Sequence, residues 1–201
     1  MPKQVDQDER RQAMSEAVWR VVAERGMDGL TMRAVADAAG CTTGMVTHYF
    51  RDKKALMAHA RSVMHHRMAH RADVLAAQST ARETLRSVCE QALPLDAERR
   101  LETVVWMHFQ LAARTDAELL HLHASAHASW VHRLTGAMRA ALGRPEPADL
   151  EERVHSLVAC LDGLALNAVT DPDAYPPELL RRVLATHLDL VLATPEGTAH
   201  S

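Results

Sequence analysis

Hydroxyl residues, a histidine and cations lie close together in the stretch AGCTTGMVTHYFRDKKAL, which runs from Ala39 to Leu56. If the middle of this stretch is helical, one face of the helix carries short polar side chains, from Thr42, Thr43, Thr47 and His48. Hydroxyl and imidazole groups of this reach can contact phosphates or base edges when a helix lies in the major groove of DNA. The residue types and their spacing therefore predict contacts to a nucleic acid.

Gly44 and Lys53 extend this interpretation to the backbone and to charge. Glycine leaves space for close backbone approach, and the start of the helix that contains Gly44 directs N–H groups toward an anion. Lys53 lies in the first turn of the next helix, where its charge opposes the helix dipole and is costly unless a phosphate lies nearby. The alternative interpretation is a small three-helix core whose polar face is only solvated.

Two short helices joined by a glycine turn must position these groups. Thr31 can cap a helix that ends near Ala39, Gly40 breaks it, and a second helix covers about 43–49. A helix over about 8–25 precedes the pair and a long helix over about 53–76 follows it, which together make a helix-turn-helix unit. The small residues Ala36 and Gly40 are expected to let the two helices approach closely.

The rest of the chain also has a helical pattern. Apolar residues recur at steps of three and four with no sustained alternation, so we expect an all-α fold of about nine helices and no strands. Thr80-x-x-Glu83 and Thr115-x-x-Glu118 have the form of capping boxes, which open helices. The helices expected after residue 76 cover about 80–94, 97–114, 115–142, 150–170 and 177–193. A domain boundary is expected after residue 62.

Composition and charge restrict the partners. The chain has 201 residues, of which 47% are hydrophobic and 3% are aromatic, a bias that favours helix over sheet. Its net charge is -3, but residues 1–70 hold 11 Lys and Arg against 8 Asp and Glu, so only this part is expected to meet a polyanion. No apolar run reaches the roughly 20 residues of a membrane span, and the polar N-terminus is unlike a secretory signal. We therefore expect a cytoplasmic protein with no membrane partner.

The run GLTMRAVADAAGCTTGMVTHYFRDKKAL, over 29–56, resembles the DNA-binding signature of the TetR family of bacterial repressors. The Ala-Gly turn, the Tyr-Phe pair and the lysine that follows lie at that family's spacing. TTGMVTHYFRDK and the later CLDGLALNAV are similar to the branch that includes the repressor of choline-to-betaine synthesis genes. Met45 and Thr47 depart from the commoner residues, so base preference is not transferred.

The resemblance implies two domains with different functions and a set of residues that contact DNA. Residues 1–62 would form the helix-turn-helix DNA-binding domain, and residues 63–201 the effector-binding and dimerisation domain. The DNA contacts implied by matching positions come from Thr31, Arg33, Thr42, Thr43, Thr47, His48, Tyr49 and Lys53. Tyr49 can also be mainly a packing residue.

Polar residues on apolar helix faces mark a candidate effector site. Arg67, His108 and His123 each fall within apolar arcs, and buried polar groups must either pair with one another or line a cavity. The resemblance implies a cavity for a small effector. The candidate lining residues are Arg67, His70, Trp106, His108, Phe109, His123 and Trp130. The alternatives are an ion pair between domains for Arg67, a hydrogen-bonded core position for His108 and ordinary core packing for Trp130.

Metal binding and catalysis have little support in the sequence. His66/His70 and His123/His127 have the i, i+4 spacing that places two imidazoles on one helix face, but no HExxH glutamate or cysteine pair accompanies them. We therefore expect no metal and no cofactor, and a metal-responsive repressor that uses these histidines is the alternative. No nucleophile elbow, phosphate-binding loop or acid/base pair appears, so no catalytic residue is assigned and an enzyme is not expected.

The last two helices carry more apolar surface than one flank can hide. Ala159 and Gly163 form a step of small residues on one of them, and the other contributes Leu180, Leu184 and Leu188. A monomer core would account for these residues, but a symmetric dimer interface is expected, as in the family. Twofold symmetry also suits DNA reading, because half-sites one turn apart require recognition helices about 34 Å apart.

The combined expectation is a homodimeric, ligand-responsive transcriptional repressor that binds a double-stranded, pseudo-palindromic DNA operator and is released by a small-molecule effector. Choline is a poor candidate for that effector, because a cage for a quaternary ammonium needs several aromatic side chains and this chain has few. A helical enzyme, or a helical interaction module without specific DNA binding, are the rivals from other classes.

Overall fold

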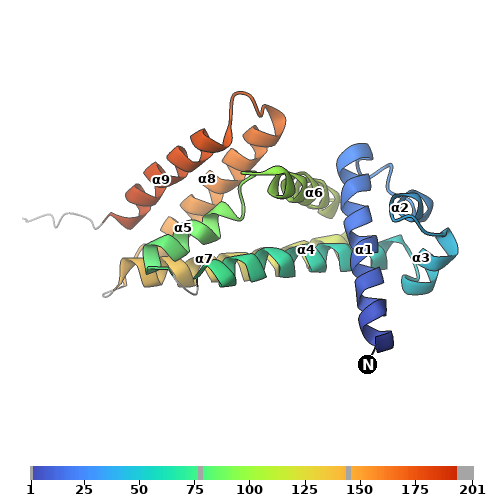
Figure 1. Cartoon of the computed structure of the whole chain (residues 1–201). Coiled ribbons are helices and arrows are strands. Elements are labelled where there is room, and N and C mark those ends of the chain that lie inside the picture. Colours follow the sequence, from blue (N-terminus) through green and yellow to red (C-terminus); the bar gives the residue numbers. More distant parts are fainter. Residues whose placement is uncertain (1, 77–78, 144–145, 194–201) are drawn as a thin grey trace, which may run out of the picture. The chain divides into compact units, whose positions relative to one another are not determined.

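A computed structural model of the chain describes residues 2–76, 79–143 and 146–193 (Figure 1). Within these ranges it contains nine α-helices and no strand, which confirms the predicted fold class. The helices are α1 (Pro2–Arg25), α2 (Met32–Ala38), α3 (Thr43–Tyr49), α4 (Lys53–Ala76), α5 (Ala81–Glu90), α6 (Ala97–Ala113), α7 (Ala117–Leu142), α8 (Leu150–Thr170) and α9 (Pro177–Leu192). None of these helices is long and apolar enough to cross a membrane.

Side-chain caps and one glycine define the two short helices. Thr31 Oγ1 accepts a hydrogen bond from the Ala34 amide at 3.0 Å, and Thr42 Oγ1 accepts one from the Met45 amide at 3.2 Å. Gly40, in the turn between α2 and α3, has a φ of +66°, where other residues are strained. A Cβ at this position would meet nothing within 4 Å, so the glycine is needed for its backbone conformation and not for the close approach we expected.

The two predicted capping boxes have different outcomes. At the start of α5, Thr80 and Glu83 form the reciprocal bonds of a capping box, as predicted. At the start of α7 the predicted box is wrong, because the Asp116 carboxylate accepts hydrogen bonds from the Glu118 and Leu119 amides at 3.0 and 3.2 Å. A carboxylate one residue closer to the helix satisfies the same N–H groups and also complements the helix dipole.

Contacts divide the chain into two compact units. Unit 1 consists of Met1–Arg71 and Asp96–His127, and unit 2 of Ala72–Leu95 and Ala128–Ser201. The division passes through α4 and α7, and it does not follow the boundary predicted after residue 62. The reason lies in unit 1, where α6 packs against α1 (Figure 1) and thereby adds a segment distant in sequence to the N-terminal helices.

Each unit has its own hydrophobic core. In unit 1, α1 packs on α2 and α2 packs on α3, and the fully buried Val35 and Val46 lie at the centre of the helix-turn-helix. The burial of Val35 and Val46 holds α3 against α2. Burial of one such side chain contributes about 1.5 to 3 kcal/mol to the stability of the fold. In unit 2, α9 packs on α8 and on α5. The largest fully buried side chains of unit 2 are Leu85, Leu93, Leu134, Met138, Leu157, Leu161, Leu180 and Leu184.

Candidate nucleic-acid interface and buried charged clusters

The outer face of α3 consists of exposed polar residues. Val46 is buried, whereas Thr43, Gly44, Thr47 and His48 are exposed. The Thr47 hydroxyl donates a hydrogen bond to the Gly44 carbonyl at 3.0 Å, and its oxygen can still accept hydrogen bonds. The helix therefore presents a shallow polar surface of short side chains on a rigid support, a surface that can enter a DNA groove.

The other predicted DNA contacts flank this face. Thr31, Arg33 and Thr42 are exposed, at the starts of α2 and α3. The hydroxyls of Thr31 and Thr42 cap their helices, so the observed role of these threonines is to hold the first backbone N–H groups of α2 and α3. Tyr49 is half-buried and packs on the core of unit 1, with the His48 ring edge-on at 5.2 Å. Packing is its observed role.

The two lysines at the start of α4 have different partners. Lys53 is half-buried, and its Nζ donates a hydrogen bond to the Met27 carbonyl at 3.2 Å. An ammonium has three donors, so two of them are available to a phosphate. Lys54 Nζ instead lies 3.1 Å from Asp116 and 3.9 Å from Glu118. The hydrogen bond to Asp116 raises the pKa of Lys54, and its charge is balanced within the protein.

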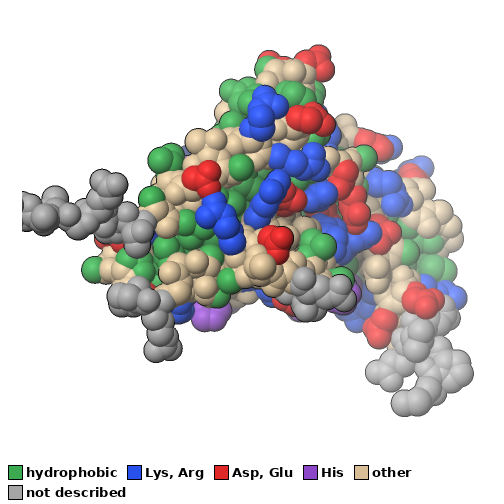
Figure 2. Space-filling model, turned by 60° about the vertical axis from the view of Figure 1, so that its left-hand side comes forward, with side chains coloured by type: hydrophobic (Ala, Val, Ile, Leu, Met, Phe, Trp, Pro, Cys, Tyr) green, Lys and Arg blue, Asp and Glu red, His purple; other side chains and the backbone are tan. Residues whose placement is uncertain are grey.

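Charge of a single sign does not cover the molecular face drawn in Figure 2. On that face, Lys and Arg side chains are interspersed with Asp and Glu side chains. Many of these charges are therefore neutralised locally and offer little to a polyanion.

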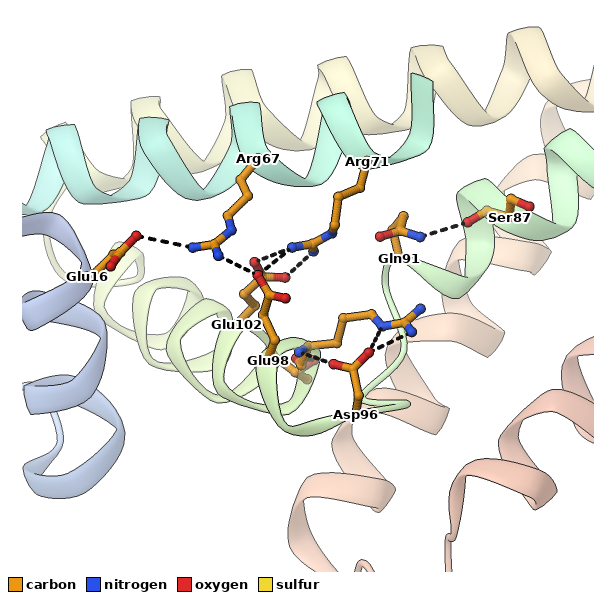
Figure 3. Close-up of polar contacts among 10 residues, drawn as sticks. Glu16, Arg67, Arg71, Ser87, Gln91, Asp96, Glu98 and Glu102 are labelled. Carbon is orange, nitrogen blue, oxygen red and sulfur yellow. Dashed lines mark hydrogen bonds and ion pairs between the residues drawn. The ribbon is translucent and has the colours of Figure 1, made fainter. Parts of the chain in front are cut away.

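A network of arginines and glutamates joins α1, α4 and α6 within unit 1 (Figure 3). Arg67 lies 3.3 Å from Glu16 of α1 and 2.7 Å from Glu98 of α6, and its guanidinium lies over the Trp19 ring at 5.8 Å. The ion-pair alternative that the sequence left open for Arg67 therefore describes its contacts. The pair with Glu16 joins the predicted domains 1–62 and 63–201, whereas Glu98 lies in the same predicted domain as Arg67.

Arg71 holds the most deeply buried carboxylate of this network. Its two Nη atoms donate to the two oxygens of Glu102 at 2.9 and 2.5 Å, a bidentate pairing, and Glu98 lies 3.1 Å away. Glu102 is only 3% exposed, whereas the Arg71 side chain is 25% exposed. The bond to Glu102 is the main cause that raises the pKa of Arg71. Such a carboxylate is tolerated in the core because both of its oxygens are paired.

The remaining candidate effector residues differ in burial and belong to two units. His70 is exposed, Phe109 is 3% exposed in the core of unit 1, and Trp106 and His108 are half-buried. Trp130 belongs to unit 2, where it packs against the core. Open grooves of about 430 and 450 Å³ lie among the described residues of unit 2, and neither of these is lined by a predicted effector residue. Among these candidates, His123 is half-buried and has a buried ring nitrogen, Nδ1, without a hydrogen-bond partner among the described residues.

Arg61 is a candidate that the sequence reasoning missed. It is 7% exposed, and its Nε has no hydrogen-bond partner among the described residues; the same is true of Nδ1 of His123. Burial lowers the pKa of Arg61 to about 10, so the guanidinium remains charged at neutral pH. Burial, followed by the Arg61 and His127 charges, lowers the pKa of His123. The signal in the sequence is an arginine at the apolar α4 positions that Met57, Ala60 and Met64 also occupy.

The predicted histidine pairs make contacts of other kinds in the structure. The rings of His123 and His127 stack at 6.0 Å, and His66 Nδ1 lies 2.7 Å from the Ser62 carbonyl. Across the described ranges there is no group of three His, Cys, Asp or Glu residues that could hold a metal ion. The metal-responsive alternative therefore lacks a site in that part of the chain.

The residues predicted for a dimer interface fall into two groups. Leu180, Leu184 and Leu188 are 0%, 1% and 3% exposed within one chain, so they belong to the core of unit 2 and offer no surface to a second chain. This corrects their predicted role, since the core of unit 2 already covers the face on which they lie. Ala159 is exposed, and Gly163 is half-exposed with nothing within 4 Å of a Cβ placed there.

Comparison with known proteins adds to this geometry. Residues 16–60 match the model of the family described as bacterial regulatory proteins, tetR family, and residues 81–193 match that of the BetI-type transcriptional repressor, C-terminal. The chain is 29% identical to the HTH-type transcriptional regulator PksA of Bacillus subtilis (strain 168), over 95% of this chain and 94% of that protein. It is 30% identical to the HTH-type transcriptional regulator BetI of Burkholderia thailandensis, over 96% and 98% of the two chains. A crystal structure of a transcriptional regulator from Rhodococcus sp. Rha1 superposes with a TM-score of 0.81 at 29% identity, and covers 90% of this chain and 95% of its own.

Proposed function

We propose a function from the premise that the chain belongs to the TetR family of bacterial transcriptional regulators and has a BetI-type C-terminal domain. Proteins of this family are regulators and not enzymes; they bind DNA operators and small effectors and are generally dimeric. The chain is accordingly a ligand-responsive DNA-binding regulator. The proposal concerns how it acts: as a repressor that a small molecule releases from a pseudo-palindromic operator.

The exposed polar face of α3 is the observation that carries the DNA-binding part. Thr43, Thr47 and His48 would meet base edges, with Gly44 at the closest backbone approach. Thr31, Arg33, Thr42 and Lys53 would contact phosphates and so fix the register of α3 on the duplex. Tyr49 would act mainly by packing, which keeps the outer face of α3 in place.

The effector would act by shifting a population. It would bind more tightly to a conformation in which the spacing of two α3 helices in a dimer no longer fits the operator, so the affinities for effector and operator are reciprocally coupled. His123, Trp106 and His108 remain candidates for effector contact, because each is half-buried in unit 1. Arg67 and Phe109 would contribute through the ion network and the core.

Binding to the DNA immediately upstream of the chain's own gene tests this function directly. The labelled fragment is titrated with purified protein at several salt concentrations and against scrambled competitor. Specific binding should resist competitor, and the logarithm of its affinity should fall linearly and steeply with the logarithm of salt concentration. If neither this fragment nor a random-sequence selection gave a specific site, the interaction-module alternative would replace the repressor.

Lys53→Ala is expected to weaken binding to all DNA sequences about equally. One phosphate contact is lost, so the slope of log affinity against log salt should become shallower by about 1. Lys54→Ala is the matched control, because it removes the same charge one residue away from a group already paired with Asp116 and Glu118. Equal effects of the two substitutions on the slope would show that Lys53 makes no specific phosphate contact.

The dimer surface is proposed to lie on the outer faces of α8 and α9. Ala159, Gly163 and Leu166 are spaced by four and three residues and so share one stripe of α8. Leu166 is 55% exposed, and Leu190 of α9, which packs on α8, is 66% exposed. Large apolar side chains beside small ones on paired helices suit a four-helix interface between two chains.

Leu166→Glu is expected to dissociate that dimer. A carboxylate at the centre of an apolar contact would be buried without a partner, and the twofold axis would bring two such charges together. Sedimentation at micromolar concentration should give twice the chain mass for the unaltered protein and one chain mass for the variant. Leu111→Glu, at a residue of unit 1 that is 64% exposed, serves as the control. Dissociation by both substitutions, or by neither, would argue against the α8 surface.

A further inference from the structure

Three arginines on α4 have unequal partners. Arg67 and Arg71 each contact carboxylates, from Glu16, Glu98 and Glu102. Arg61 is the most buried of the three, yet it makes no hydrogen bond or ion pair with the residues that the structure describes, and its Nε lies buried. A buried N–H without a partner among the described residues costs about 1 to 3 kcal/mol, a sizeable part of the stability of a small domain. The contacts within the folded chain therefore do not explain why an arginine occupies this position.

The surroundings of Arg61 add polar and apolar character. On α4, the neighbouring Met57, Ala60 and Met64 are buried, and Leu119 of α7 belongs to the same apolar cluster. From α7, His123 also belongs to unit 1, and its Nδ1 is buried without a partner among the described residues. Burial first, and the Arg61 charge second, lower the pKa of His123. An unpaired guanidinium, an unpaired imidazole nitrogen and methionine side chains therefore occur together in unit 1.

We propose that Arg61 and His123 recognise the carboxylate of the effector, and that the effector is an organic acid with an apolar body. The planar guanidinium fork matches a carboxylate through its Nε and one Nη, and a neutral imidazole with its proton on Nδ1 can donate a further hydrogen bond. The methionines and Leu119 would contact the apolar part of the ligand. The inference rests on the proposed function, since it names the class of effector that the regulator takes.

The positive charge of Arg61 favours an organic acid over cationic, neutral and phosphorylated effectors. A quaternary ammonium such as choline would place a second cation beside an unpaired guanidinium, and the chain has few aromatic side chains to offset the repulsion. A neutral ligand would leave the guanidinium unpaired. A phosphorylated ligand would satisfy the charge, but its two negative charges would exceed the single cation of the cluster.

Thermal unfolding with simple probes tests the class. Hexanoate is compared with its neutral amide hexanamide, with choline chloride and with inorganic phosphate, each at about 20 mM and equal ionic strength, because a fragment of this size binds only at millimolar concentration. Hexanoate should raise the unfolding midpoint of the unaltered protein by about 3 °C or more, and the other three should not. Equal shifts with hexanoate and hexanamide, or a shift with phosphate alone, would overturn the carboxylate assignment.

Arg61→Met provides the decisive variant. Without ligand, its unfolding midpoint should equal or exceed that of the unaltered protein, since methionine fills the apolar position without an unpaired charge. The hexanoate shift should disappear in Arg61→Met, shrink in His123→Leu and persist in part in Arg61→Lys. A large loss of stability or of folded protein in Arg61→Met would show that the guanidinium already stabilises the ligand-free core, which would overturn the proposal.

Measurements of operator binding distinguish a failure of the proposed effector class from a failure of the proposed repressor function. If the protein and its variants bind the upstream DNA but hexanoate stabilises none of them, the effector class is wrong and the repressor function stands. If no specific DNA is bound while the hexanoate shift depends on Arg61, the carboxylate site stands and the repressor function fails. Release of the operator by hexanoate in the unaltered protein, and not in Arg61→Met, would support both.

Discussion

Thr47→Glu is expected to lower operator affinity by at least about 100-fold, as measured by fluorescence anisotropy with labelled operator. Thr47 lies on the exposed face of α3, so a carboxylate there would meet the phosphates and acceptor atoms that the groove presents. Because the position is exposed and glutamate has a higher helix propensity than threonine, the variant should keep its fold. An unchanged unfolding midpoint would verify this.

Two further variants isolate the position of the charge. Gln110→Glu adds the same charge at an exposed residue of α6 and should leave operator affinity within a few-fold of normal. Thr47→Ala removes the hydroxyl without adding charge, and should alter sequence preference more than overall affinity. If Thr47→Glu and Gln110→Glu gave similar small losses, α3 would not be the element that enters the groove.

The features that the sequence predicted well are those decided by local chemistry. The bounds of α3 and α4 agree with the prediction residue for residue, because Thr42 caps α3 and the start of α4 follows within a few residues. The capping box of Thr80 and Glu83 is likewise settled by four consecutive residues. The capping residue of α7 was missed by one position, because Asp116 competes with Thr115 for the same amides and a carboxylate is the stronger acceptor.

Which carboxylate pairs with each arginine of α4, in contrast, depends on how helices distant in sequence approach α4. Arg61, Arg67 and Arg71 are the same residue type on one helix, and the local sequence does not show which of them meets a carboxylate. Only the approach of α1 and α6 brings carboxylates to Arg67 and Arg71, from positions as far away in sequence as Glu16 and Glu102. Periodicity identified Arg67 as an inward residue but could not show that ion pairs already occupy it.

The same limit applies to apolar faces. The repeat in α9 marks Leu180, Leu184 and Leu188 as one stripe, but periodicity does not tell whether that stripe faces the chain's own core or a second chain. Their burial assigns them to the core, and the exposure of Leu166 and Leu190 moves the candidate dimer surface to the opposite faces of α8 and α9. Burial within one chain is the information that the sequence lacks.

Arg71→Met is expected to destabilise the protein by about 3 kcal/mol, because it leaves the carboxylate of Glu102 buried without its bidentate partner. Glu102 is 3% exposed, so water cannot replace both hydrogen bonds without opening the packing between α4 and α6. Denaturant unfolding at neutral pH measures the loss. Arg86→Met, which breaks the more exposed pair with Glu90, should cost less than about 1 kcal/mol.

The double variant Arg71→Met, Glu102→Leu is expected to recover most of the lost stability. With both charged groups replaced by apolar side chains, no carboxylate is left buried alone, and such replacements of buried ion pairs are often neutral. The coupling energy from the cycle should therefore be large, at about 2 to 3 kcal/mol. If the double variant were as unstable as Arg71→Met alone, the pair would stabilise the packing of α4 on α6 through its own geometry. If apolar residues can replace the Arg71–Glu102 pair without loss of stability, the pair is not what the fold requires of this network. The contribution that apolar residues cannot supply would then be the ionic connection from α6 to α1, through Glu98, Arg67 and Glu16.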